Sequence, residues 1–139
     1  LQAPEITRAL DILGANITTL AQLSRDMGAE PIFVTQRSTA WAWRDGQLVG
    51  ITDIEPGFLN RYTERFGQIN GVDIHMIERS IADRILQSCQ QADAICFDLM
   101  GEVDFDLAQD FYDEVHNTAK GAGVVARYLQ GKLSALDGF

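Results

Sequence analysis

Two side chains near the end of the chain have the types and spacing for acid–base chemistry. Asp113 and His116 lie three residues apart. In nucleophilic acyl transfer a neutral imidazole removes the proton of a hydroxyl, and a carboxylate on the other ring nitrogen fixes the tautomer. At an i, i+3 offset in a turn both side chains can lie on one side. The spacing fits an orienting acid and a base, and it also fits a surface turn with a helix-capping Asp.

The third member of such a triad, an activated serine, is not evident. A nucleophilic serine in an α/β hydrolase occupies a sharp turn between a strand and a helix. None of the serines has such surroundings; they are Ser24, Ser38, Ser80, Ser88 and Ser134. We therefore expect the chain to be inert alone and to receive its nucleophile from a missing N-terminal segment.

The apolar pattern predicts the elements that would position this pair. Three-and-four spacing predicts helices over 5–27 and 77–89, and short apolar runs predict buried strands at 32–35 and 94–99. Thr118 is a plausible N-cap for a last helix. Helices alternating with strands are typical of a doubly wound parallel sheet, with sites at its carboxyl edge.

Two strands are few for a parallel sheet. Such sheets are normally covered on both faces, and a pair would leave an edge unpaired and helical stripes uncovered. We expect an N-terminal segment with about three more strands, either before Leu1 or as a separate chain.

The segment at about 39–51 differs from its surroundings. Asp45-Gly46 is a tight-turn pair between two short apolar runs, so a hairpin or lid-like excursion is expected. It follows the end of the first strand. Gln36 and Trp41 are therefore candidate substrate-binding residues, with Trp43 beside them, and an oligomer contact is the alternative. A short helix is predicted near 59–66.

Several stretches resemble the closing segment of the SGNH (GDSL) hydrolases. In that family an apolar strand ending in Asp-Leu precedes Asp-x-x-His, Thr-x-x-Gly and the last helix. Residues 94–99, 111–121 and 124–126 match this order, and 32–36 resembles the family's penultimate strand. The resemblance implies that Asp113 is the triad acid and His116 the base.

The resemblance also implies a fold and an activity. The fold would be a three-layer α/β/α sandwich with a flavodoxin-like parallel sheet, of which this chain supplies the last two strands and flanking helices. The activity would be ester hydrolysis through an acyl-enzyme, without a metal or organic cofactor. Substrates would be small-molecule, carbohydrate or lipid esters. Residues 1–139 would form the C-terminal part of a single α/β hydrolase-type domain.

The chain departs from the family pattern in its nucleophile block. Gly-Asp-Ser is absent, as is the Gly that donates to the oxyanion hole, and Gly14 to Ile17 matches the family's Gly-x-Asn-Asp block only superficially. The missing N-terminal segment would carry these groups. The alternative hypothesis is a non-catalytic flavodoxin-like module that binds a ligand or partner.

Composition limits the remaining classes. The formal charge of −9 repels phosphate backbones, so nucleic acid is not an expected partner. No apolar run reaches the roughly 20 residues of a membrane span. Cys89 and Cys96 fit no metal or redox spacing and are predicted to be buried free thiols. Asp73 and His75 lack a third ligand, so a solvated loop His is expected. Compartment and oligomeric state stay open, and a homo-oligomer is possible.

Overall fold

The structure, a computed structural model, describes residues 4–51 and 69–136, and it is a mixed α/β fold. It divides into two compact units, described separately below. The first comprises Leu1–Gln36 and Ile77–Glu102, and the second Arg37–Met76 and Val103–Phe139. The helix predicted near 59–66 lies outside the described residues. No helix in the described ranges is long and apolar enough to cross a bilayer.

The first unit opens with the long predicted helix. Helix α1 runs over Pro4–Asp26. It ends where Gly28 takes a φ of 78°, a left-handed conformation that costs glycine little. The Ala29 N–H then donates to the carbonyl oxygen of Ser24 at 2.9 Å. The sequence-based prediction of both the helix and its glycine cap is confirmed.

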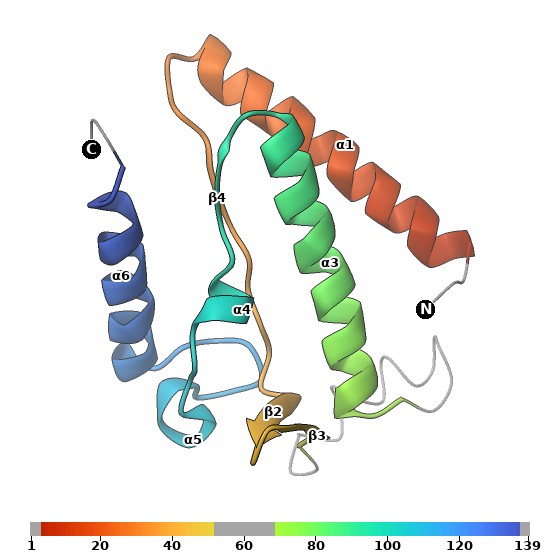
Figure 1. The fold of residues 1–139 in the computed structure, drawn as a ribbon, viewed down its shortest axis with the longest axis vertical. Helices are drawn as coiled ribbons and strands as arrows, with labels where there is room; N and C mark the ends of the chain where they lie inside the picture. Colours follow the sequence, from red (N-terminus) through yellow and green to blue (C-terminus); the bar gives the residue numbers. More distant parts are fainter. Residues whose placement is uncertain (1–3, 52–68, 137–139) are drawn as a thin grey trace. The chain divides into compact units, whose positions relative to one another are not determined.

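Two short parallel strands form the sheet of the first unit. Strand β1 (Ile32–Val34) pairs in parallel with β4 (Ile95–Phe97), with Ile32 opposite Ile95 (Figure 1). The predicted parallel arrangement of these segments is confirmed. The expected burial on both faces is not seen, because Ile32 remains 36% exposed. Within the described residues the sheet has two strands and no flavodoxin-like extension.

Helix α3 (Gly71–Gln91) begins in the second unit and continues into the first. Asn70 accepts hydrogen bonds from the N–H groups of Val72 and Asp73, and the Asp73 carboxylate accepts one from the Asn70 N–H. This reciprocal pair is a capping box, which satisfies donors at the helix start. His75 is therefore a helical residue and not the loop residue predicted, and Asp73 caps the helix.

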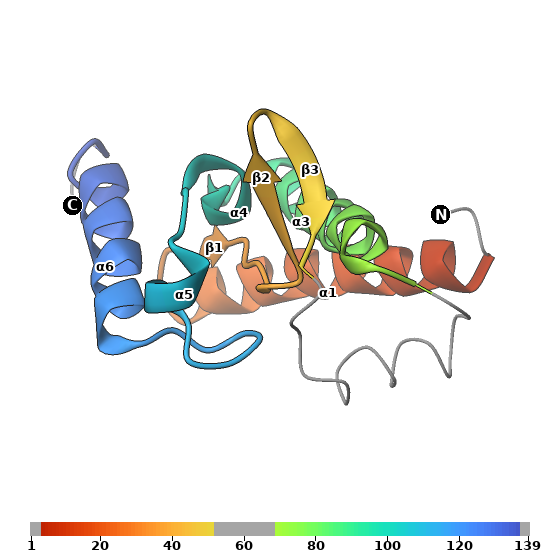
Figure 2. The same cartoon turned by 90° about the horizontal axis from the view of Figure 1, so that it is seen from below.

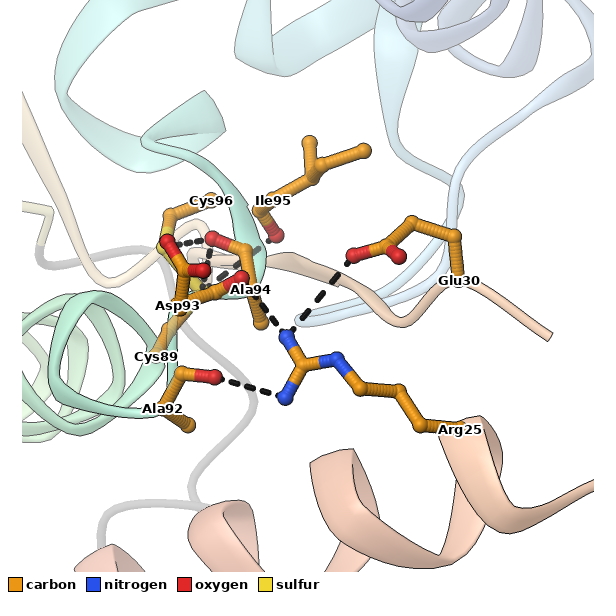
Figure 3. Close-up of a disulfide and its surroundings, with 8 residues drawn as sticks. All are labelled: Arg25, Glu30, Cys89, Ala92, Asp93, Ala94, Ile95 and Cys96. Carbon is orange, nitrogen blue, oxygen red and sulfur yellow. Dashed lines mark hydrogen bonds and ion pairs between the residues drawn. A yellow bond between two sulfur atoms is a disulfide. The ribbon is translucent and has the colours of Figure 1, made fainter. Parts of the chain in front are cut away.

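The prediction of two free thiols was wrong, because Cys89 and Cys96 form a disulfide that joins the end of α3 to β4 (Figure 3). Arg25 lies beside it and donates to the carbonyl oxygens of Ala92 and Asp93 at 2.7 and 2.6 Å. Ala92 and Asp93 follow the last residue of α3, Gln91, so the guanidinium supplies donors to carbonyls of the turn that leaves the helix. The disulfide and Arg25 thus fix the turn between α3 and β4.

The second unit contains the hairpin that the Asp-Gly pair predicts. Strands β2 (Trp41–Arg44) and β3 (Gln47–Gly50) pair antiparallel (Figure 2). Asp45 and Gly46 both have positive φ, 52° and 76°. Two successive positive φ values are what a two-residue type I′ turn requires.

The start of α3 packs closely on this hairpin. A side chain on Gly71 would collide with the carbonyl oxygen of Ala40, so only glycine permits the approach. Trp41 and Trp43 both meet the His75 ring edge-on, with centroids 4.4 and 6.2 Å away. Alternate residues of a strand point to the same face. The two tryptophans therefore share the face of β2 that covers α3.

Two further helices complete the second unit. A short helix α5 (Leu107–Asp110) precedes the candidate pair, and α6 (Ala119–Leu133) follows it. Between β4 and α5, Leu99–Glu102 forms one turn, α4, which belongs to the first unit. The predicted cap is confirmed, because the Thr118 hydroxyl accepts a hydrogen bond from the Gly121 N–H at 3.2 Å.

Candidate functional site

Asp113 and His116 lie in a loop whose ends are held together by backbone pairing. Phe111 and Asn117 form an antiparallel bridge, and inside it the Tyr112 N–H donates to the carbonyl oxygen of His116 at 3.1 Å. The Thr39 N–H, from the segment that leads into β2, donates to the Glu114 carbonyl oxygen at 2.9 Å. The loop is thereby tied both to itself and to the hairpin.

The junction of α5 and α6 explains the Thr-x-x-Gly spacing that follows the loop. The carbonyl oxygen of Asp110 accepts hydrogen bonds from the Thr118 N–H and the Asn117 side chain. A Cβ on Gly121 would collide with that same carbonyl. Glycine at 121 is therefore what lets α6 start against the end of α5, and Figure 2 shows the two helices adjacent.

Asp113 organises the loop with both of its oxygens. Its Oδ1 accepts hydrogen bonds from the N–H groups of Val115 and His116 at 2.9 and 2.8 Å. Its Oδ2 lies 2.8 Å from Nδ1 of His116. From the sequence, capping a turn and orienting an imidazole were alternative roles for Asp113. In the structure its carboxylate makes the contacts of both roles.

These contacts change the acidity of the carboxyl group. Hydrogen bonds from the Val115 and His116 N–H groups, followed by the contact with the His116 ring, lower the pKa of Asp113 to about 2. Donors directed at a carboxylate favour its ionised form. With that anion beside Nδ1, the neutral ring is arranged to carry its proton on Nδ1 and a lone pair on Nε2. That tautomer is the one a general base needs.

The pair is open to solvent on the described part of the molecule. The His116 side chain is 64% exposed and that of Asp113 is 39% exposed. Tyr112 stacks on the His116 ring with centroids 5.7 Å apart and planes 12° apart, which restricts the ring's tilt. Within residues 4–51 and 69–136 no serine hydroxyl hydrogen-bonds to His116. A hydroxyl from elsewhere would find the imidazole accessible.

A pocket of about 410 Å³ lies beside Asp113 within the second unit, and His116 is not one of its lining residues. Asp113 lines it, and other walls come from the hairpin side and from α5 and the residues after it: Arg44, Ile51, Leu107, Ala108, Phe111 and Tyr112. Its volume is in the range of small-molecule sites. Neither Arg44 nor Tyr112 was predicted from the sequence as a site residue. Strand alternation from Trp41 could have placed Arg44 on the opposite face of β2.

The two predicted substrate-binding residues lie elsewhere. Trp41 is 2% exposed, with the Arg37 guanidinium 3.7 Å from its ring centroid, and it does not line the pocket beside Asp113. Gln36 belongs to the first unit, where it lines a hollow of about 240 Å³ with Val34 and Ile81 among its other walls. A substrate role for either residue stays a prediction.

A second polar cluster lies at the carboxyl end of β1 and β4. The Thr35 hydroxyl donates to Asp98 at 2.7 Å, and Arg79 pairs with the other carboxylate oxygen at 2.8 Å. Partial burial alone would raise the pKa of Asp98, but the hydrogen bonds from Thr35 and Arg79 outweigh it and lower the pKa. The cluster joins the two strand ends to α3, which is a structural role.

No grouping of three or more His, Cys, Asp or Glu suited to a metal ion occurs in the ranges that the structure covers. Comparison with protein-family models, with curated proteins and with solved structures gives no match to this chain.

Proposed function

We propose that this chain supplies the acid–base half of an SGNH-type serine ester hydrolase. His116 is the base, Asp113 orients it, and a segment outside these 139 residues contributes the serine and the oxyanion-hole donors. The observation that carries the proposal is the 2.8 Å contact between Asp113 Oδ2 and His116 Nδ1. It agrees with the Asp-x-x-His and Thr-x-x-Gly resemblance to that family.

The mechanism follows from the tautomer that Asp113 favours. Nε2 of His116 takes the serine proton as the hydroxyl oxygen attacks the ester carbonyl, and the imidazolium then gives that proton to the departing alcohol. Water activated by the same nitrogen hydrolyses the acyl-enzyme. Asp113 stays ionised throughout, because its pKa of about 2 lies far below neutral pH.

The proposed fold is a three-layer α/β/α sandwich with flavodoxin-like winding. The parallel β1–β4 pair would be its last two strands, and the nucleophile-bearing segment would add strands to it. Support comes from the incomplete covering of the present sheet, where Ile32 is 36% exposed. Two-stranded parallel sheets are seldom stable without covering layers.

Substitution of the pair in the complete protein tests the proposal. His116→Ala should lower kcat for ester hydrolysis by roughly 10³-fold or more, and Asp113→Asn should cause a loss of similar order. Asp104→Asn removes another exposed acid that makes none of these contacts and should leave kcat unchanged. Initial rates with a soluble acetate ester provide the measurement. An unchanged kcat in His116→Ala would remove His116 from the mechanism.

A non-catalytic binding module remains the second candidate. It is favoured by the fact that, within the described ranges, no hydroxyl nucleophile reaches His116 while a pocket of about 410 Å³ is present. A complete protein that binds a small molecule here but turns over no ester would establish this alternative.

A further inference from the structure

The pocket beside Asp113 has one basic side chain in its wall, and this cation has no acidic partner in the described part of the chain. Arg44 is exposed and forms no ion pair there, whereas Arg79 and Arg84 each pair with an aspartate. The protein as a whole carries nine more formal negative than positive charges. An unpaired guanidinium in an acidic protein, at the wall of a small-molecule-sized pocket, points to recognition of an anion.

The hairpin geometry explains why Arg44 faces this pocket. Trp41 and Trp43 contact His75 on one face of β2, so Arg44 projects from the opposite face. The Ile51 N–H donates to the Ala40 carbonyl oxygen at 2.8 Å, which continues the strand pairing and places Ile51 on the Arg44 face. Both residues line the pocket. The type I′ turn at Asp45 and Gly46 fixes this register.

The remaining walls specify what accompanies the anion. Leu107, Phe111 and Ile51 are apolar, and Tyr112, whose ring stacks on His116, also lines the pocket. The Asp113 carboxylate at the wall is already engaged by two N–H groups and by the His116 ring. A ligand would therefore meet Arg44 as its charged partner, with Thr39 as a polar neighbour and mainly apolar side chains along the rest of its length.

We propose that this pocket binds the carboxylate end of a half-ester substrate through Arg44, with the ligand's hydrocarbon chain along Leu107 and Phe111. This inference rests on the proposed function. A guanidinium matches a carboxylate with two parallel hydrogen bonds. One carboxylate fits better than a phosphate dianion, because a single cation balances one charge and Asp113 repels the second.

Two esters with the same acyl length test the proposal in the complete protein. Monoethyl glutarate and ethyl pentanoate differ in that a terminal carboxylate replaces a methyl group. The wild-type kcat/KM should favour monoethyl glutarate by roughly 10-fold or more, as expected for a charge-assisted hydrogen bond. Arg44→Gln should abolish that preference by raising KM for monoethyl glutarate while kcat stays unchanged, since the contact is made equally in the ground and transition states.

Three further variants distinguish binding by Arg44 from other causes of the preference. Arg127→Gln removes an exposed arginine of the same unit that does not line the pocket, and it should retain the preference. Arg44→Lys keeps the charge but loses the planar fork, so it should retain part of the preference. His116→Ala, which should not turn over, allows calorimetric measurement of monoethyl glutarate binding, and adding Arg44→Gln should weaken that binding by the same factor as KM.

The outcomes separate this inference from the proposed function. Hydrolysis of both esters without a preference, or with a preference that survives Arg44→Gln, would overturn the carboxylate site and leave the hydrolase intact. Loss of the preference in Arg127→Gln would also overturn it, because the effect would then come from net charge. Failure to hydrolyse either ester would count against the hydrolase, while calorimetry would still decide whether Arg44 binds the carboxylate.

Discussion

At the residue scale, Asp113 links the local folding of the loop to its proposed chemistry. One oxygen holds the turn through the N–H groups of Val115 and His116, and the other contacts the imidazole. A carboxylate that is fixed by the backbone cannot swing away from the ring without breaking the turn. The imidazole is thereby held in one orientation, which is what its proposed role as a preorganised base requires.

The acidity of Asp113 gives the first prediction at this scale. Its pKa is lowered from 3.8 to about 2, so the ionised form stabilises the folded loop above pH 4, and this contribution is lost as the pH falls through about 2. A ¹³C NMR titration of the Asp113 carboxyl carbon should show a midpoint near 2. A midpoint for Asp113 near 4 would mean that the hydrogen bonds do not form in solution.

The pair was predictable from the sequence, whereas its pocket was not. Asp and His three residues apart can meet in almost any turn, so the contact follows from local spacing. Arg44 and Asp113 are far apart in the chain and share a pocket only because the hairpin register and the loop closure bring them together. Trp41 shows the converse: its position after the end of the first strand suggested ligand contact, but packing against His75 buries it.

At the element scale, the start of α6 depends on two adjacent features. Thr118 caps the helix, and Gly121 leaves space for the carbonyl oxygen of Asp110. Together they determine where the loop carrying Asp113 and His116 ends. The cap was predictable from the residue types around Thr118, but the close approach depends on α5, a short helix that the sequence indicates only weakly.

Glycine substitutions in α6 test this junction. Gly121→Ala should lower the free energy of unfolding by about 1–3 kcal/mol, because the methyl group must displace the Asp110 carbonyl. Gly131→Ala is the matched control in the same helix: open space surrounds that position, and the better helix propensity of alanine should raise stability by up to about 1 kcal/mol. Urea denaturation gives both values. Equal effects of the two substitutions would contradict the close approach.

The disulfide was not predictable from cysteine spacing alone. Cys89 and Cys96 are seven residues apart and match no motif. Their pairing depends on α3 ending at Gln91 and on the turn through Asp93, whose φ of 54° reverses the chain into β4. Two thiols that looked like ordinary buried side chains are thereby brought to a Cα separation of 6.1 Å.

Thiol chemistry provides the corresponding prediction. In the denatured protein, prepared without reductant, neither Cys89 nor Cys96 should react with a disulfide reagent, and both should react after reduction. Closing so short a loop should stabilise the fold by up to about 2.5 kcal/mol in the chain-entropy model. Reductant should therefore lower the Tm of the wild type but not that of the double variant Cys89→Ala and Cys96→Ala. Two reactive thiols without reductant would show that the bond does not form.

At the scale of the whole molecule, the predicted parallel pairing is confirmed, whereas the predicted burial of the strands on both faces is not seen. Apolar runs at 32–35 and 94–99 indicated strands without indicating how many neighbours each would have. The structure pairs them with each other, and Ile32 stays exposed. Pairing is determined by these two segments alone, whereas burial on both faces depends on layers that the described residues do not supply.

In the proposed function, His116 activates a serine that lies outside these 139 residues. An imidazole base accelerates attack by a serine on a phosphorus centre as it does on a carbonyl. The most direct measurement is labelling of the complete protein with a fluorophosphonate probe, followed by mass spectrometric identification of the modified peptide. We expect one labelled serine outside residues 1–139 and loss of labelling in His116→Ala. Labelling at an unchanged rate in His116→Ala, or none in the wild type, would contradict it.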